Sequence, residues 1–390
     1  MTRRIGVGLI ATGWMGQVHS RAYRSMPSRF PEYGIEPRLV ICADNVEARA
    51  KGVQTRFGFE KITTDWRKVL ENPDVEVVNI TAPNNKHLEF IQAAVAAGKH
   101  VFCEKPVGRS PEEAAAAEEA TRKAGVLSFT GFCYRWAPLV QWLGGLISDG
   151  RLGDITHYRG RFLVGYATNP NGVLSWRFDR DIAGTGSLGD LMSHVVDMAH
   201  FLVGPMERVV SQSDTYIKER PLATPGEGTH FSVSTGGPRA PVTNEDYVGA
   251  LTRFVDGANG TLEVCRVVAG EKCQMAFELN GTKGAARWNF EKMNEIEVYL
   301  PEETEVHDGY ARIYSGPEHP LHGRFTPGPA LGLGYEDLAT IEVSQFLKCV
   351  ADGEQIEPSF RAVRDVAEVH AAMTRSWSSG SWENVRPIDL

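Results

Sequence analysis

Asp190, His194 and Asp197 lie within an otherwise apolar segment, GSLGDLMSHVVDMAHFL, and combine two carboxylates with an imidazole. They are four and three residues apart, so a helix would place them side by side on one face. Burial of a carboxylate and an imidazole costs free energy unless each group has a partner. The pattern therefore indicates either a satisfied polar contact in the core or an acid–base pair that faces a functional site.

Lys105 is a further candidate for chemistry. It follows the apolar run HVFCE and precedes Pro106, which restricts the backbone. At the end of a buried strand, where a ligand could bind, an ammonium would stabilise negative charge that develops on an oxygen. A surface lysine beside a turn is the alternative, so the interpretation depends on the elements around Lys105.

The elements expected around these residues alternate between strands and helices. Short apolar segments rich in β-branched residues predict strands, at 5–10, 39–43, 75–80, 100–103 and 127–130. Helical segments lie between them, and the segment 111–124 has the cap signals Ser110 before it and Gly125 after it. Such alternation predicts an α/β fold with a doubly wound parallel sheet, a Rossmann domain at residues 1–131.

The motif ATGWMG at residues 11–16 follows the first predicted strand and opens a helix, the context that a dinucleotide fingerprint requires. Gly13 would let the backbone approach a pyrophosphate, Gly16 would permit close packing, and the helix N-terminus offers free N–H groups. Ala11 replaces the first glycine of the pattern, and a plain tight turn is the alternative. The cofactor contacts expected here are Thr12, Gly13, Trp14 and Met15.

Asp44 ends the apolar run VICAD, where a carboxylate would accept hydrogen bonds from the adenosine ribose and repel a 2′-phosphate. NAD is therefore favoured over NADP, although Arg49 one turn later leaves NADP open, and a helix N-cap is the alternative role for Asp44. APNNKH and CEKP end two further strands, at the edge where open parallel sheets bind ligands. The cofactor contacts expected from these motifs are Ala82, Pro83, Asn84, His87, Glu104 and Lys105.

After residue 131 the pattern changes to longer strands. Alternating polar and apolar residues predict a mostly antiparallel sheet with one exposed face. The strands are expected at 155–164, 209–217, 247–254, 261–268, 275–280, 285–289 and 296–299, and further helices at 138–148, 337–351 and 362–376. The Pro/Gly-rich segments 221–241 and 315–334 predict long loops with a functional or intersubunit role. Residues 132–390 are thus expected to form a C-terminal α/β domain.

Composition excludes several classes of function. A chain of 390 residues is long enough for two domains. The 41 basic and 49 acidic residues give a net charge of −8 without a basic block, so nucleic acid is not an expected partner. No apolar run approaches the roughly 20 residues of a membrane helix. The six scattered cysteines contain no C-x-x-C, which indicates buried reduced thiols in a cytoplasmic protein and no metal site.

Five motifs, ATGWMG, APNNKH, GKHVFCEKP, FCYRW and GTGSLGDLMSHVVDMAHFL, occur in the order found in the Gfo/Idh/MocA oxidoreductases, and the whole chain resembles that family. The resemblance implies a nicotinamide cofactor, an N-terminal Rossmann domain and a C-terminal α/β domain with an open-faced sheet. It also implies a small polyhydroxylated substrate and a homodimer or homotetramer formed through the open-faced sheet.

In the sugar and inositol dehydrogenases of this family, the E-K-P lysine acts with a D-x-x-x-H pair, which here corresponds to Lys105, Asp190 and His194. The resemblance makes His194 the general base, since imidazole can take an alcohol proton near neutral pH. Asp190 would bind a substrate hydroxyl and stabilise the imidazolium. Asp197 is expected either to support these residues from behind or to make a structural polar contact.

A narrower similarity links SWRFDRDIAGTGSLGD, IKERPL and GPEHP to levoglucosan-type pyranoside dehydrogenases. It implies that Trp176, Arg177 and Tyr335 lie near the nicotinamide or the substrate, with interface packing as the alternative for the first two. The substrate contacts expected overall are Lys105, Arg177, Asp190, His194 and Tyr335. Val164 and Gly165 replace residues that are polar in that subgroup, which leaves the sugar open.

Three functions fit the sequence. The leading hypothesis is an NAD-dependent dehydrogenase that oxidises a ring hydroxyl of a sugar, pyranoside or inositol. The second is a hydrolase or lyase that uses NAD transiently and acts through a keto-sugar. The third is a non-catalytic NAD-binding regulator, although such proteins typically lose the lysine or the histidine, and this chain keeps both.

Overall fold

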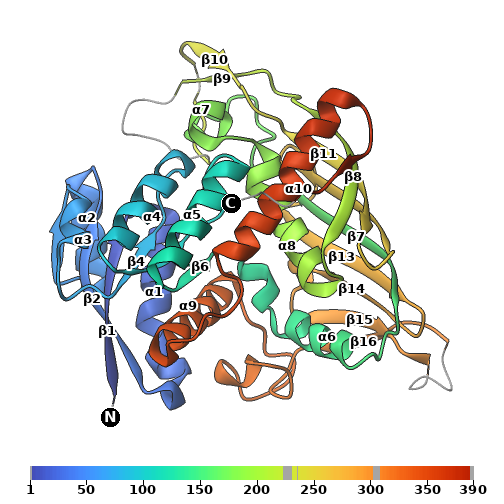
Figure 1. Cartoon of the computed structure of the whole chain (residues 1–390), viewed down its shortest axis with the longest axis horizontal. Coiled ribbons are helices and arrows are strands. Elements are labelled where there is room, and N and C mark those ends of the chain that lie inside the picture. The colour runs from blue at the N-terminus through green and yellow to red at the C-terminus, as the bar shows by residue number, and fades with distance from the viewer. Residues whose placement is uncertain (1, 223–230, 235, 302–307, 387–390) are drawn as a thin grey trace.

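The computed structural model describes residues 2–222, 231–234, 236–301 and 308–386. In addition to a two-stranded sheet, two large sheets stand side by side, one built from the N-terminal third and one from the rest of the chain (Figure 1). One buried apolar cluster extends through both. At the junction, the rings of Phe102, Phe129 and Phe346 lie 5.5–5.8 Å apart and join the first sheet to a C-terminal helix.

The first sheet is six-stranded and parallel, in the order β3-β2-β1-β4-β5-β6. Its strands are β1 (Arg3–Ile10), β2 (Ile35–Ala43), β3 (Lys61–Thr63), β4 (Val77–Ile80), β5 (His100–Cys103) and β6 (Ser128–Thr130). The strand order reverses between β1 and β4, and this switch point is where doubly wound sheets bind dinucleotides. The predicted Rossmann fold is therefore confirmed.

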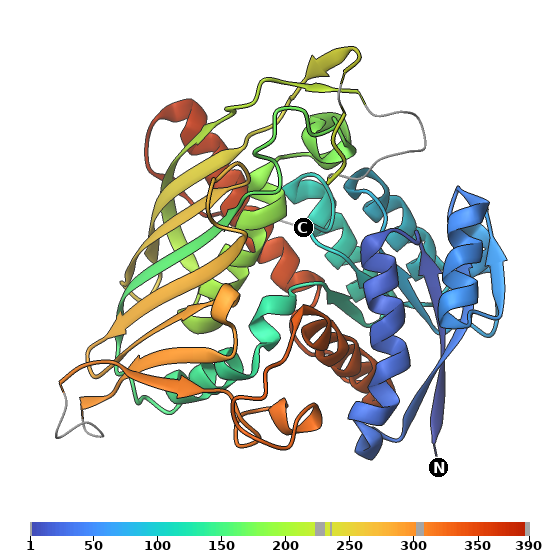
Figure 2. The same ribbon diagram turned by 180° about the vertical axis from the view of Figure 1, so that it is seen from behind.

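Helices cover both faces of this sheet. They are α1 (Trp14–Arg29), α2 (Glu47–Phe57), α3 (Arg67–Leu70), α4 (His87–Ala96) and α5 (Pro111–Ala124). The predicted caps of α5 are present, since the Ser110 hydroxyl accepts from the N–H of Glu113 and Gly125 adopts a φ of 65°. A helix from the end of the chain, α9 (Tyr335–Asp352), packs against α1 and completes the layer opposite α4 and α5 (Figures 1 and 2).

The second sheet has nine strands in the order β16-β15-β14-β13-β7-β12-β11-β8-β17. They are β7 (Ile155–Val164), β8 (Met206–Asp214), β11 (Tyr247–Phe254), β12 (Asn259–Cys265), β13 (Cys273–Gly281), β14 (Ala285–Asn289), β15 (Glu295–Tyr299), β16 (Ala311–Tyr314) and β17 (Glu383–Asn384). The pair β7–β12 is parallel and the other pairs are antiparallel, which confirms the predicted, mostly antiparallel sheet.

One face of this sheet packs against α8 (Ser193–Leu202) and α10 (Phe360–Ser379), while α6 (Pro138–Ser148) lies beside α8. The other face is open and carries ion pairs, such as Arg159 and Arg161 with Glu278 at 3.8 and 3.7 Å. The division at residues 131 and 132 remains a proposal, because α9 returns to the first sheet.

Short or interrupted elements differ from the predictions. Strands β3 and β16 were not expected, since segments of three and four residues show little periodicity. The predicted loop 221–241 begins in β9 (Glu219–Pro221) and ends in β10 (Arg239–Pro241), and its residues 223–230 and 235 lie outside the described part of the chain. The strand predicted at 261–268 ends at Cys265, because Arg266 turns inward to the buried Asp246.

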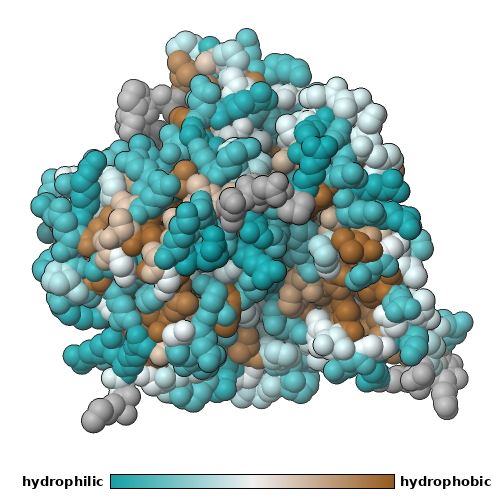
Figure 3. All heavy atoms as spheres, viewed as in Figure 1, coloured by the Kyte–Doolittle hydropathy of each residue, from teal (hydrophilic) through white to brown (hydrophobic). Residues whose placement is uncertain are grey.

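Other expectations from composition can also be checked. All six cysteines are free thiols, five of them buried. No helix within the described ranges is long and apolar enough to cross a membrane. Hydrophobic residues on the face shown in Figure 3 lie in separate patches among hydrophilic ones. Among the residues that the structure describes, no group of three or more His, Cys, Asp and Glu side chains is arranged to hold a metal ion.

Candidate active site

Lys105 and Asp190 meet where the two sheets approach each other. Lys105 follows the carboxyl end of β5, and its Nζ donates to the Asp190 carbonyl oxygen at 2.6 Å and to Asp190 Oδ1 at 3.0 Å. Both side chains are largely buried, with 14% and 26% of their surfaces exposed. A lysine from the first sheet and a carboxylate from the second part of the chain thus form one ion pair.

Asp190 does not lie on a regular α-helix. Residues Leu188–Met192 form a π-helical turn, η5, and the α-helical geometry of α8 begins only at Ser193. Such π turns occur frequently at functional sites. The preceding glycines let this turn approach its neighbours: a Cβ on Gly186 would lie 2.0 Å from the Glu245 carbonyl oxygen. The sequence pattern did not distinguish this π turn from a continuous helix.

His194 sits inside a wall of aromatic rings and is only 6% exposed. The rings of Tyr134, Phe162 and Phe132 lie 4.7, 5.9 and 6.0 Å from the imidazole, centroid to centroid. Its Nδ1 is buried and has no hydrogen-bond partner among the described residues. Burial and then the charge of Lys105 hold the pKa of His194 well below its usual range, against an opposing effect of Asp190. The imidazole is therefore neutral at neutral pH, the form that accepts a proton.

Asp197 faces away from this group and has the structural contact expected of it. It receives two hydrogen bonds from the guanidinium of Arg135, which belongs to the FCYRW motif. Both residues are buried. Burial raises the pKa of Asp197 to about 6, although Arg135 acts in the opposite direction.

The turn between β1 and α1 has the features of a pyrophosphate site. Gly13 is the N-cap of α1, no side chain caps that helix, and its first turn contains no acidic residue. A Cβ on Gly13 would meet no atom within 4 Å, whereas one on Gly16 would lie 2.5 Å from the Ala11 carbonyl oxygen. Free N–H groups thus face open space, as a bound dinucleotide requires.

Asp44 stands at the end of β2 beside this turn. Its Oδ2 accepts from the backbone N–H and the hydroxyl of Thr12 at 2.9 and 2.8 Å, and its Oδ1 accepts from the N–H of Val46 at 3.0 Å. These donors fix the carboxylate at the sheet edge where the ribose of a dinucleotide lies. The residues present fit NAD.

Family comparisons agree with this geometry. Residues 5–132 match a family described as oxidoreductase with an NAD-binding Rossmann fold, and residues 140–287 match the GFO/IDH/MocA C-terminal domain. The chain belongs to the Gfo/Idh/MocA family. The predicted family and its NAD cofactor are thereby confirmed.

Individual relatives are similar over nearly the whole chain. Levoglucosan dehydrogenase of Pseudarthrobacter phenanthrenivorans is 39% identical over 388 residues, which cover 99% of each chain. Inositol 2-dehydrogenase of Rhizobium meliloti is 24% identical over 93% of this chain and 96% of its own. A solved structure of levoglucosan dehydrogenase in complex with NADH and levoglucosan has a TM-score of 0.92 and 37% identity, and covers 98% of this chain and 100% of its own.

Tyr335 connects the cofactor turn of this Gfo/Idh/MocA protein to the wall around His194. Its ring stacks on Trp14, with centroids 5.7 Å apart and planes at 12°, and its hydroxyl donates to the Met15 sulfur at 3.7 Å. On the other side it lies 6.4 Å from the ring of Tyr134. The structure thus places the predicted residue Tyr335 between the predicted cofactor contacts and the predicted base.

The motif APNNKH is anchored to the protein through two of its predicted residues. One ring nitrogen of His87 lies 2.7 Å from the Ala82 carbonyl oxygen and the other 2.9 Å from that of Pro106. Burial lowers the pKa of His87, although the two carbonyl contacts act in the opposite direction. Asn84 Nδ2 donates to the Ala183 carbonyl oxygen at 2.9 Å. These contacts join the loops after β4 and β5 to the second part of the chain.

Glu104 points into the interior. Its Oε1 lies 2.9 Å from His19 Nε2, and its Oε2 accepts from the backbone N–H of Lys105 at 3.2 Å. His19 in turn contacts Asn79, whose Nδ2 lies 2.8 Å from Nδ1 of the ring. Glu104 therefore fixes the backbone of Lys105, a contact that the EKP motif alone did not predict.

Trp176 and Arg177 lie in the 3₁₀ turn η4 (Trp176–Phe178), and the Arg177 guanidinium sits 4.3 Å above the Trp176 ring. The Arg177 carbonyl accepts from Asn244 Nδ2 at 2.9 Å and from the buried Arg266 at 3.2 Å. The side chain of Arg177 acts electrostatically on Tyr166, which contacts Asp190. Arg177 therefore lies near enough to Tyr166 to act on it, and a role of Trp176 at the site stays a prediction.

Sequence reasoning missed the aromatic residues that surround His194 and contact Asp190. Phe132 and Tyr134 belong to the FCYRW motif, which begins two residues after β6, and this position at the binding edge was the available signal. Phe162 lies on β7 and Tyr166 just after it. The sequence offers no signal for either residue, because their partners His194 and Asp190 come from distant segments.

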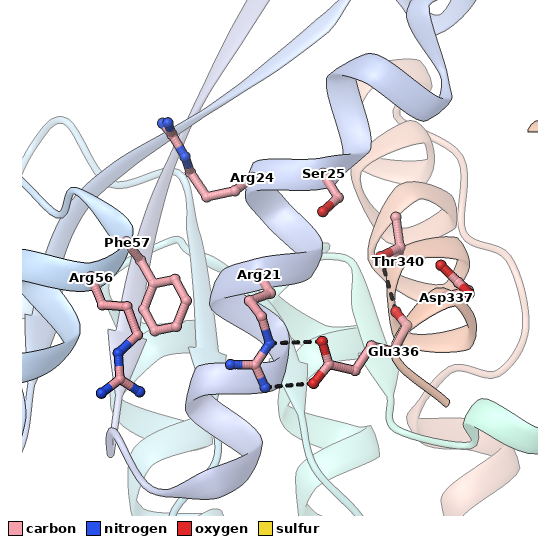
Figure 4. A pocket seen from close by; sticks show the side chains of 8 residues that line it. All are labelled: Arg21, Arg24, Ser25, Arg56, Phe57, Glu336, Asp337 and Thr340. Atoms are coloured by element: carbon pink, nitrogen blue, oxygen red, sulfur yellow. Dashed lines mark hydrogen bonds and ion pairs between the residues drawn. The ribbon is translucent and has the colours of Figure 1, made fainter. Parts of the chain in front are cut away.

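A separate pocket of about 270 Å³ lies between α1, α2 and α9 and contains none of the predicted site residues (Figure 4). Arg21 and Glu336 face each other across it with two hydrogen bonds of 2.7 and 2.6 Å. Glu336 follows Tyr335 directly at the start of α9, so this ion pair joins the start of α9 to α1, the helix that follows the ATGWMG turn.

Proposed function

We propose that this protein is an NAD-dependent dehydrogenase that oxidises a ring secondary hydroxyl of a sugar, pyranoside or inositol, with pyranosides preferred. The observation that carries the proposal is the contact of Lys105 with Asp190 beside the buried, neutral His194, at the binding edge of an NAD-binding sheet. The names of the relatives, which oxidise levoglucosan and inositol, support the same class of substrate.

NAD, when bound, supplies the acceptor for the hydride. Lys105 Nζ carries three N–H donors, of which two are directed to Asp190, and the third is assigned to the oxygen of the reacting hydroxyl. The neutral His194 takes the hydroxyl proton, and the ammonium stabilises the negative charge that develops on oxygen. Asp190 holds Lys105 and accepts from a neighbouring hydroxyl, so a vicinal diol suits the site better than an isolated alcohol.

Arg177, Trp176 and Tyr335 are proposed to complete the substrate side. Arg177 offers donors to hydroxyl groups, and its stacking on Trp176 leaves the opposite face of the indole for the C–H face of a sugar ring. Asp44 is proposed to bind the adenosine ribose and to favour NAD over NADP. We also propose that the protein forms a homodimer or homotetramer through the open face of the second sheet. Its six free thiols favour a cytoplasmic location.

The test is a substrate panel measured as NADH formation: glucose, levoglucosan, methyl glucosides, disaccharides, myo-inositol, scyllo-inositol, acidic sugars and simple aliphatic alcohols. Accumulation of NADH with neutral polyhydroxylated rings is expected. Activity confined to charged substrates or to aliphatic alcohols would contradict the proposal, and activity on inositols alone would overturn the pyranoside preference. Product formation without net NADH would favour a hydrolase or lyase that uses NAD transiently. NADH binding without turnover would favour a non-catalytic NAD-binding regulator.

A further inference from the structure

Tyr166 reaches the catalytic group from the end of β7. Its hydroxyl donates to Oδ2 of Asp190 at 3.2 Å, while Lys105 Nζ donates to Oδ1 of the same carboxylate at 3.0 Å. The two oxygens of Asp190 are thus held by two donors from different parts of the fold. A carboxylate held at one oxygen can rotate, whereas donors at both oxygens fix its plane.

The backbone beside Tyr166 is itself fixed. The neighbouring Ala167 donates its N–H to the Arg266 carbonyl oxygen at 3.1 Å, and its carbonyl accepts from the guanidinium of Arg220. Arg220 and Arg266 are each only 1% exposed, and both guanidinium groups lie over the ring of Phe178, at 4.2 and 4.5 Å. The ring of Tyr166 packs against the apolar cluster of Ala167, Phe178 and Val242.

The hydroxyl of Tyr166 remains a donor at all working pH values. Burial and the charge of Asp190 raise the pKa of the phenol above its usual range, although the charges of Arg266 and Arg177 lower it. A phenol that does not ionise cannot take the alcohol proton, and that role stays with His194. The acceptor is a carboxylate, and the 3.2 Å distance is longer than the distance of about 2.5–2.7 Å in the strongest bonds of this kind.

We propose that Tyr166 is a positioning residue that acts through Asp190. While Lys105 donates its third N–H to a substrate hydroxyl, Tyr166 and Lys105 together keep the Asp190 carboxylate in place for the neighbouring hydroxyl. This proposal rests on the proposed dehydrogenase function. It assigns a task to the cluster of Arg220, Phe178 and Arg266, which supports the tyrosine from behind.

The experiment is a double-mutant cycle of Tyr166→Phe and Asp190→Ala, with kcat/KM measured as NADH formation on the best substrate of the panel. Hydrogen bonds to charged groups contribute about 1.5–3 kcal/mol, and the 3.2 Å distance favours the lower end, so Tyr166→Phe is expected to lower kcat/KM about tenfold. In the Asp190→Ala background the same change is expected to have less than about a twofold effect, since the partner is gone. Equal factors in both backgrounds would overturn the proposal.

The matched control is Tyr158→Phe. Tyr158 lies on the same strand, β7, and its buried hydroxyl has no hydrogen-bond partner among the described residues. Its loss is expected to leave kcat/KM within about a factor of two. A loss equal to that of Tyr166→Phe would mean that any missing hydroxyl in this strand damages the site, and would contradict a specific role for Tyr166.

Thermal unfolding of the same variants separates this proposal from the proposed function. If Tyr166 and Asp190 are coupled, the Tm loss of the double variant is smaller than the sum of the two single losses. Coupled Tm values in a protein that oxidises no compound of the panel would overturn the dehydrogenase and, with it, the positioning role. Additive Tm values in an active enzyme would overturn the Tyr166 proposal alone.

Discussion

The rings of His194 and Tyr134 meet edge to face, with centroids 4.7 Å apart and planes at 86°. This contact and the two phenylalanines beside it remove water from the imidazole, which disfavours its charged form. The positive charge of Lys105 acts in the same direction. The site therefore keeps a histidine ready to accept a proton, with a cation beside it that stabilises the alkoxide.

His194→Ala is expected to lower turnover about 10²- to 10⁴-fold, the usual contribution of a general base, while NADH affinity stays unchanged. For the wild type, kcat/KM is expected to stay constant as the pH is lowered to just below 6.5, because the lowered pKa of His194 means that it is protonated only at a more acidic pH. The measurement is kcat/KM from pH 4.5 to 9, together with NADH titration of the variant. If kcat/KM already falls above pH 6.5 as the solution is made more acidic, the pKa of the base is not lowered, which would contradict the assignment of the buried His194 as the base.

Gly13 and Gly16 are expected to fail differently when each is changed to alanine. At Gly13 a methyl group meets no protein atom but enters the space assigned to the pyrophosphate, so Tm is expected to stay constant while the Kd for NADH rises at least about tenfold. At Gly16 the methyl lies 2.5 Å from the Ala11 carbonyl oxygen, and overpacking of this kind costs about 1–3 kcal/mol of stability. Unfolding curves and NADH fluorescence titrations measure both. Unchanged NADH affinity in Gly13→Ala would place the pyrophosphate elsewhere.

The parts of the fold that follow from local periodicity were predictable, and the parts that depend on tertiary partners were not. Alternating strands and helices predicted the Rossmann sheet, and the five motifs supplied the candidate site residues, two of which, Lys105 and Asp190, are in contact. The burial of Arg220 and Arg266 could not be predicted, since arginine is rarely fully buried. The contact of Tyr166 with Asp190 joins residues that are 24 positions apart, and it depends on how their segments pack together, which local periodicity does not indicate.

Asp44→Ser is expected to reduce the preference for NAD over NADP by about tenfold or more, because it removes a negative charge beside the position of a 2′-phosphate. Thr12→Val is the matched control: it removes one hydrogen bond to the same carboxylate and keeps the charge, so it should affect both cofactors alike. The measurement is kcat/KM for each cofactor with all three proteins. A wild type that prefers NADP, or equal shifts in both variants, would contradict this role of Asp44.

Two half-buried histidines with buried ring nitrogens are expected to make the protein less stable as the pH falls below 6.5. The Nε2 atoms of His200 and His370 are buried without a partner among the described residues, and burial lowers their pKa values to about 4 and about 3. Between these values and the ordinary 6.5, the unfolded chain binds protons that the native state does not, so the free energy of unfolding falls by up to about 1.4 kcal/mol per pH unit for each group. Asp197 opposes this trend, because its pKa of about 6 lets the native state bind a proton that the unfolded chain does not.

His200→Gln isolates one of these contributions, because glutamine does not titrate. The slope of the unfolding free energy between pH 6.5 and 4 is expected to decrease by up to about 1.4 kcal/mol per pH unit in this variant, whatever its absolute stability. His157→Gln is the control, since His157 is exposed in the native state and its replacement should leave the slope unchanged. Urea unfolding at a series of pH values measures all three proteins. Equal slopes in the wild type and His200→Gln would show that His200 is protonated in the native protein, and that solvent reaches α8 where the structure buries it.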